Sequence, residues 1–269
     1  MSKRSLLVPH DFTHVADNAV QYAMNLATVI DADVDLLHIV KDKKDIKKNL
    51  AKLEDVVAKV KDKPAGVELR AHCITGHIYT EIAAKAAELH SRIIVMGTHG
   101  AKGMQKLFGS FAIKVITSTH VPFLVVQDDS KGMDLSKIVV PIDESQESLQ
   151  IEQVVSGIAE IAKSEVHVVS EKKIDSGVKL TTAVHAGLLI KQFKEHGIAN
   201  SSTVLDKKKG YASDIVTYAK TNGANLIAFA YHSDSLLPQF DTFAQNLITN
   251  KDGVPVMVIN SKEAGNYFF

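Results

Sequence analysis

A glycine-rich segment is the part of the chain whose residue types and spacing are most typical of a binding site, here one for an anion. It reads GTHGAKG from Gly97 to Gly103, and Gly109-Ser110 follow it. Glycines let a backbone approach an anion closely, and a helix N-terminus presents free N–H groups and the positive end of its dipole. Ser110 can cap such a helix and reach a phosphate oxygen. The segment therefore predicts either a phosphate cradle or, more plainly, a tight turn followed by a helix cap.

Short β-branched runs alternate with amphipathic stretches in the first half of the chain. Five runs are expected to be strands, at residues 6–9, 34–40, 67–72, 93–96 and 122–126. Four helical stretches lie between them, at residues 16–30, 46–60, 78–89 and 110–119. Parallel neighbours need such crossovers, so the pattern predicts a parallel α/β sheet. Ligands of such sheets bind beyond the carboxyl ends of the strands, where Asp11 and the glycine-rich segment are expected.

The same plan returns in the second half. The triplet Pro9-His10-Asp11 reappears as Pro141-Ile142-Asp143, 132 residues later, and the run VPFLVV faces VPVMVI at an offset of 133. The strands of this copy are expected at residues 137–141, 165–169, 200–205, 225–230 and 255–259. A polar segment, residues 127–136, separates the copies. The sequence therefore predicts two tandem domains, at residues 1–128 and 136–262.

The order of these motifs resembles the universal stress protein family. The resemblance rests on Pro9-x-Asp11, the run Leu-Leu-His-Ile that ends at Ile39, Met-Gly-Thr-His-Gly at residues 96–100, and Gly109-Ser110, and it covers both copies. It implies an α/β fold of two tandem doubly wound domains, each a five-stranded parallel sheet of order 3-2-1-4-5 with helices on both faces. One branch of the family binds ATP through a Gly-x2-Gly-x9-Gly-Ser/Thr motif, and another branch lacks both the motif and the nucleotide.

The resemblance also implies which residues of the first copy would bind an adenine nucleotide, whether ATP, ADP or AMP. Asp11 would stand at the adenine and ribose end, with the Ile39 backbone beside the base. The other residues that would flank the ribose or line the phosphates are Pro9, Met96, Gly97, His99, Gly100, Gly109 and Ser110. No metal is implied beyond a Mg²⁺ ion that accompanies the nucleotide.

Departures from the ATP motif keep a second hypothesis open. Eight residues, 101–108, separate Gly100 from Gly109 where the motif has nine. One missing residue moves the Gly109 amide by up to about 3.5 Å, which is comparable with a hydrogen-bond length. In the second copy AYHS at residues 230–233 replaces Gly-x-x-Gly, and Asp241 would cap a helix but set a carboxylate where a phosphate would lie. The alternative is a stress-induced interaction protein that binds no nucleotide.

Histidines raise the question of a metal site or of catalysis. Four of them fall near the carboxyl ends of expected strands: His10, His38, His72 and His99. No HExxH or CxxC spacing is present, so zinc is the weaker interpretation and hydrogen-bonded rim residues the stronger one. The sequence has no nucleophile elbow, motif-placed carboxylate pair or P-loop lysine, so at most slow ATP hydrolysis is expected. Asp143, without a glycine loop beside it, is expected to brace the helix that follows.

Composition excludes several classes of protein. Of 269 residues, 45% are hydrophobic and 23% charged, which excludes disorder and collagen. Lys plus Arg equal Asp plus Glu at 31 each, so neither a nucleic acid nor a membrane surface is expected as a partner. The lone Cys73 and a short N-terminal apolar run favour a cytoplasmic protein. The resemblance to universal stress proteins implies two partners: an adenine nucleotide, and the other half of the chain, paired through VPFLVV and VPVMVI as an internal pseudo-dimer. A homodimer stays open.

Overall fold

Helices and strands alternate throughout the computed structural model, which describes residues 3–60, 63–98, 108–128, 130, 134–232 and 241–261. The elements of the first half are β1 (Ser5–Pro9), α1 (His14–Ile30), β2 (Asp33–Val40), the 3-10 turn η1 (Lys43–Asp45), α2 (Ile46–Lys59), β3 (Leu69–Thr75), α3 (Ile78–Glu88), β4 (Ile93–Thr98), α4 (Phe108–Ile116) and β5 (Phe123–Gln127). Those of the second half are β6 (Lys137–Ile142), η2 (Gln146–Ile151), α5 (Glu152–Ala162), β7 (Glu165–Glu171), α6 (Ser176–Glu195), β8 (Ala199–Leu205), α7 (Tyr211–Thr221), β9 (Leu226–Tyr231), α8 (Thr242–Ile248) and β10 (Val256–Asn260).

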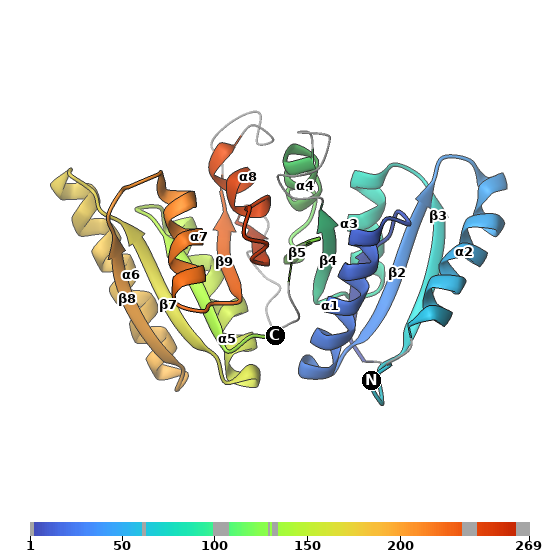
Figure 1. Ribbon diagram of the computed structural model, residues 1–269, viewed down its shortest axis with the longest axis horizontal. Helices are drawn as coiled ribbons and strands as arrows, with labels where there is room; N and C mark the ends of the chain where they lie inside the picture. The colour runs from blue at the N-terminus through green and yellow to red at the C-terminus, as the bar shows by residue number, and fades with distance from the viewer. Residues whose placement is uncertain are drawn as a thin grey trace.

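The ten strands form one sheet in the order β3-β2-β1-β4-β5-β10-β9-β6-β7-β8 (Figure 1). Each half therefore contributes five parallel strands in the order 3-2-1-4-5, which confirms the expected fold. The halves are fused rather than separate sheets, because β5 and β10 pair in antiparallel fashion, with Val125 opposite Val256 and Phe123 opposite Val258. These two strands are the segments expected to form the seam.

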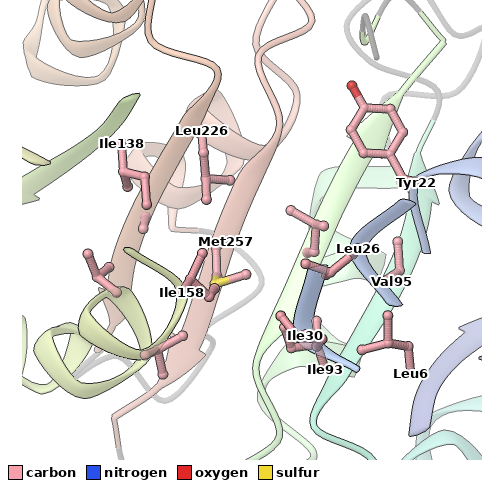
Figure 2. Packing of buried hydrophobic residues seen from close by; sticks show 14 of the residues in the cluster. Leu6, Tyr22, Leu26, Ile30, Ile93, Val95, Ile138, Ile158, Leu226 and Met257 are labelled. Atoms are coloured by element: carbon pink, nitrogen blue, oxygen red, sulfur yellow. The ribbon is translucent and has the colours of Figure 1, made fainter. Parts of the chain in front are cut away.

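Two apolar clusters, one on each face of the sheet, hold the fold together. Side chains alternate along each strand, so Leu6 enters the cluster beneath α1, α2, α5 and α6, whereas Leu7 enters the one beneath α3, α4, α7 and α8. Figure 2 shows Leu26 and Ile30 of α1 packed beside Ile93 of β4. Each such side chain contributes roughly 1.5–3 kcal/mol on burial. Both clusters run through the seam without interruption.

Helices and polar side chains also cross the seam. Helix α1 contacts α5 on one face of the sheet, and α4 lies beside α8 on the other (Figure 1). Near the end of β5, the Gln127 side-chain amide donates to the Ile248 carbonyl at 3.0 Å, and the Ser130 hydroxyl donates to the Gly253 carbonyl at 2.8 Å. The edge that β5 alone would expose is therefore paired and covered on both faces.

The cap expected for α8 is confirmed. Asp241 accepts hydrogen bonds from the backbone N–H groups of Phe243, at 2.9 Å, and Ala244, at 3.1 Å. The helix expected at residues 110–119 is α4, which spans Phe108–Ile116, so Ser110 lies within the helix. Helix bounds inferred from residue types shift by one or two residues in this way. The side chain of Ser110 lies outside the described part of the chain. Across the described ranges, no helix combines the length and the apolar content that crossing a membrane requires.

Candidate functional site

Asp11 lies at the junction of β1 and α1. One of its carboxylate oxygens accepts hydrogen bonds within the loop, and the other has no partner there. Its Oδ1 atom accepts from the backbone N–H of Thr13 at 3.1 Å and from the Thr13 hydroxyl at 2.5 Å, and Thr13 in turn caps α1. Phe12, between them, has a left-handed backbone with φ 66°. Asp11 is exposed, and no described residue bonds its Oδ2 atom. One carboxylate oxygen therefore braces the helix start, and the other faces solvent.

The end of β4 lies next to this junction. A Cβ atom on Gly97 would come within 2.3 Å of the Val15 carbonyl oxygen, so glycine is needed here for α1 to lie against β4. Thr98 is only 4% exposed, yet its hydroxyl finds no hydrogen-bond partner in the described part of the chain. Such a buried, unpaired hydroxyl calls for an explanation. Because β1 pairs with β4 in parallel at Leu7 and Ile94, the ends of the two strands are neighbours, with Asp11 two residues beyond β1 and Thr98 at the end of β4.

The other residues expected at the site fall into three groups. Pro9 at the end of β1 and Ile39 near the end of β2 are half-buried, and Met96 of β4 is buried in the cluster beneath α3 and α4. Gly109 and Ser110 lie in the first turn of α4. His99 and Gly100 lie outside the described residues. The structure therefore brings the expected residues of β1, β2 and β4 to neighbouring strand ends. Thr98, which the sequence analysis passed over, joins them.

The two histidines at this end of the sheet are engaged in internal hydrogen bonds. Nδ1 of His10 accepts from the backbone N–H of Phe12 at 3.2 Å, so Nε2 carries the proton and donates to Asp17 at 3.2 Å. Burial lowers the pKa of His10 below its ordinary value despite the Asp17 carboxylate. His38 donates from Nδ1 to the His10 carbonyl at 2.7 Å. The described residues include no group of three or more His, Cys, Asp or Glu placed to hold a metal.

His72 belongs to a separate polar cluster between β2 and β3. Its Nε2 atom lies 2.7 Å from Oδ1 of Asp35, a fully buried carboxylate that Arg70 also grips with two hydrogen bonds of 2.9 and 3.1 Å. Burial acts to raise the pKa of Asp35, but the hydrogen bonds from His72 and Arg70 outweigh it and hold that pKa well below its usual range. Burial raises the pKa of the neighbouring Cys73 thiol, which disfavours a reactive thiolate. The cluster is a structural ion network.

A groove of about 440 Å³ opens between α1 and α2. Its lining combines aliphatic side chains with charged ones, and it includes His10 and Phe12 on either side of Asp11 in the chain. The Phe12 ring lies 4.4 Å from the His38 ring, and the Lys52 ammonium lies 5.6 Å from the centre of the Phe12 ring. None of the nine residues expected to bind a nucleotide lines this groove, so it is distinct from the expected site.

Comparison with known proteins places the first half in a family. Residues 3–127 match the model of the universal stress protein family. This half of the chain is a universal stress protein domain. A universal stress protein of Methanocaldococcus jannaschii, MJ0531, is 29% identical over 143 residues, which is 48% of this chain and 84% of that protein.

Solved structures extend the likeness in fold to the whole chain. A universal stress protein from Archaeoglobus fulgidus has a TM-score of 0.79 at 17% identity, over 97% of this chain and 100% of that one. A protein of unknown function from Pseudomonas aeruginosa has a TM-score of 0.61 at 16% identity, over 96% of this chain and 92% of that one. Both halves therefore have the fold of universal stress proteins, and the chain length fits a tandem form.

The second half repeats the loop that braces the first helix of a universal stress protein domain. Oδ1 of Asp143 accepts from the backbone N–H of Ser145 at 2.8 Å and from its hydroxyl at 2.5 Å, and Ser145 caps η2. The bracing role expected for Asp143 is confirmed. Asp11 and Asp143 therefore do the same structural work in the two halves, which makes them a matched pair for comparison.

An aromatic side chain covers the strand ends beside Asp143. Tyr211 is the first residue of α7, as Ile78 is of α3, and its hydroxyl lies 2.8 Å from the Ile142 carbonyl and 2.9 Å from the Val169 carbonyl. The ring stacks on Phe243 of α8 at 5.6 Å. Burial, followed by the charge of the nearby Asp143, raises the Tyr211 pKa well above its usual value. The phenol thus ties the ends of β6 and β7 together, which the aliphatic Ile78 cannot do.

Proposed function

We propose that the universal stress protein domain of the first half binds one adenine nucleotide, ATP, ADP or AMP, and that the second half binds none. The observation that carries this proposal is the pair formed by Asp11 and Thr98. A carboxylate oxygen just beyond the end of β1 and a buried hydroxyl at the end of β4, both without partners among the described residues, lie where the winding of the sheet reverses. Ligands of doubly wound sheets bind at this position.

The adenosine part of the ligand would contact the ends of β1, β2 and β4. A ribose hydroxyl donates to the free oxygen of Asp11, and the backbone of Ile39 lies beside the base. Pro9, Met96 and Gly97 flank the ribose. Gly97 is explained by the packing of α1 alone, so it supports the shape of this site rather than the presence of a ligand.

The phosphates would lie against the first turn of α4. The first N–H groups of a helix have no partner within the helix, and Gly109 and Ser110 are the second and third residues of α4. Their amides would therefore be available to phosphate oxygens. His99 and Gly100, which lie outside the described residues, complete the phosphate side of this proposal.

The second half would not accept the same ligand, for two reasons. The half-buried Tyr211 side chain covers the ends of β6 and β7, which correspond to the base and ribose side of the first half. The Asp241 carboxylate caps α8 where phosphates would lie, and it would repel them. The proposed domains, residues 1–128 and 136–262, are therefore unequal partners of an internal pair. Occupancy of the first would serve as a signal in a stress response rather than as a step of catalysis.

Calorimetric titration of ATP, ADP and AMP into nucleotide-free protein tests this function with a matched pair of variants. Asp11→Asn and Asp143→Asn each keep one side-chain oxygen, which can still accept the two hydrogen bonds of the brace, and replace the other oxygen by a donor amide. Both variants should therefore stay folded, with similar small losses of stability in urea denaturation. We expect one site per chain in the native protein, binding weakened at least tenfold by Asp11→Asn, and unchanged binding in Asp143→Asn. Equal binding by both variants would show that Asp11 does not contact the ligand.

The alternative, an interaction protein without a nucleotide, is favoured by the eight-residue spacing between Gly100 and Gly109. A loop one residue short of the ATP motif can close over the cradle instead of surrounding phosphates. Titration distinguishes the two functions, because the alternative predicts no heat of binding for any of the three nucleotides at millimolar concentration.

A further inference from the structure

Helix α6 exposes an uncharged apolar ridge. Leu180, Val184 and Leu188 are 67%, 53% and 45% exposed, and their spacing of four residues places them in one row along the helix. Between Lys179 and Lys191 the chain has no Asp, Glu, Lys or Arg. The middle of α6, at one end of the molecule in Figure 1, therefore presents apolar side chains to solvent without the charges that usually cover such a surface.

The equivalent helix of the first half lacks such a ridge. Helices α2 and α6 each follow the second strand of their half and pack on the third. The exposed positions of α2 are nearly all charged, the exceptions being two alanines: Lys47, Lys48, Ala51, Lys52, Glu54, Asp55, Ala58 and Lys59. Because the same place in the fold is filled by a charged helix surface in one half, the fold itself does not require the apolar ridge of α6.

Two small residues, Ala183 and Gly187, lie beside the ridge. Both are exposed, and a Cβ atom on Gly187 would meet no atom within 4 Å. Because their side chains are so small, they leave room for a row of larger side chains from another helix, and this row of small residues is here called the groove. Glycine is unfavourable inside a helix, and neither packing nor a positive φ within this chain requires it here. Helices commonly pack by inserting a row of residues spaced by four into the groove of another helix, crossing at about −50°. The ridge and the groove of α6 have the shapes that such packing needs.

We propose that α6 is the contact of a homodimer in which the ridge of each copy fills the groove of the other. The ridge is symmetric about Val184, with a leucine four residues away on each side. A two-fold axis between ridge and groove, beside Val184, places the two ridges side by side in antiparallel order, with Leu180 of one copy beside Leu188 of the other. A crossing of about 50° carries the charged helix ends, Lys179 and Lys191, away from the partner. One helix per copy buries less than the ~800 Å² per partner of a standard interface, so we expect a weak dimer whose population depends on concentration.

Sedimentation velocity on the full-length chain, over a concentration range from low to several hundred micromolar, tests the contact. We expect the native protein to shift from 29.3 kDa toward twice that mass. Val184→Glu, which would set two carboxylates face to face, should weaken association at least tenfold. Ile161→Glu is the control, because Ile161 is an exposed apolar residue, 48% exposed, at the end of α5 and away from the ridge. It should associate like the native chain.

Mixing two variants tests the two-fold arrangement directly. Val184→Glu and Val184→Lys should each be monomeric alone and should form a mixed dimer when combined, because opposite charges then meet at the axis. A native chain that stays monomeric at every concentration would overturn the proposal, as would a Val184→Glu variant that dimerises normally. A monomeric native chain that sediments with phosphatidylglycerol vesicles, and loses this with Val184→Glu, would show that the ridge meets lipid instead.

Discussion

A Cβ atom on Gly97 would lie 2.3 Å from the carbonyl oxygen of Val15, where β4 contacts the first turn of α1. Any residue other than glycine would therefore force α1 away from β4. This contact sets the spacing between the two strand ends that carry Asp11 and Thr98. Gly97 therefore determines how closely α1 approaches β4 beside the proposed nucleotide site. It does so through packing, which needs no ligand.

Replacement of Gly97 by alanine is expected to destabilise the fold. The added methyl group must push α1 away from β4, and overpacking of this kind costs typically 1–3 kcal/mol. Gly187→Ala is the matched control, since its methyl group would enter open space and should stabilise α6 by about 0.5–1 kcal/mol. Urea denaturation at low micromolar concentration measures both changes. A Gly97→Ala variant as stable as the native chain would show that α1 yields easily.

The buried Asp35 carboxylate should be far more important for stability than the exposed partner of the same arginine. Asp35→Asn leaves Arg70 without its main counter-charge and should cost about 3–5 kcal/mol at pH 7. Glu68→Gln removes an exposed contact to Arg70 and should cost at most about 1 kcal/mol. Because folding lowers the Asp35 pKa, its contribution is present above about pH 4 and is lost as the pH falls through the acid range. Equal costs for the two variants would contradict the network described here.

His10 should make the fold sensitive to mild acid. Burial lowers its pKa, so below about pH 6.5 the unfolded chain takes up a proton that the folded chain resists. Stability should therefore fall from pH 7 to pH 5, by up to about 1.4 kcal/mol for each unit of pKa difference. His10→Gln keeps a neutral donor and acceptor and should show a smaller fall. Urea midpoints at the two pH values test this, and an identical fall in both proteins would refute it.

Tyr211 should support the second half through its hydroxyl as well as its ring. Tyr211→Phe keeps the stacking on Phe243 but removes the hydrogen bonds to two strand ends, at a cost of about 1–2 kcal/mol. Because folding raises the phenol pKa, the native chain should also lose stability as the pH rises above about 10, and Tyr211→Phe should lose less. Thermal unfolding at pH 8 and pH 10.5 measures both effects. Nucleotide affinity should not change.

The alternation of strands and helices predicts a parallel α/β sheet, and the duplication predicts two of them. The strand order 3-2-1-4-5 came from the resemblance to universal stress proteins, because alternation alone allows several orders. The seam also came from the resemblance, which implies that two such domains pair through their last strands, here VPFLVV and VPVMVI. The roles of single residues were harder to foresee. From the sequence, Gly97 is explained equally well by a ligand contact or by a packing contact. Only the structure shows that the backbone of Val15 leaves no room for a side chain there. Thr98 carries no signal in the sequence, because its burial and its lack of a partner arise only in the folded sheet.

Long-range contacts set the limit of the sequence analysis in the second half. The Tyr211 hydroxyl donates a hydrogen bond to the carbonyl of Ile142, 69 residues earlier in the chain, and no motif near either residue predicts this contact. The loss of glycines around Asp241 was visible, but the aromatic cover over the strand ends was not. A helix was expected from Ser110 to Thr119 on residue types alone, whereas α4 spans Phe108–Ile116, because helix bounds depend on backbone hydrogen bonds that residue types indicate only statistically. The uncharged stretch of α6 was readable in the sequence, but its exposure was not.

The most direct test of the central claim is to release the small molecules bound to natively purified protein with acid and to quantify them by chromatography and mass spectrometry. We expect one equivalent of adenine nucleotide per chain from the native protein and from Asp143→Asn, and much less from Asp11→Asn. Two equivalents per chain would contradict the inequality of the halves. No nucleotide, together with no heat on titration of ATP, ADP or AMP at millimolar concentration, would contradict nucleotide binding altogether.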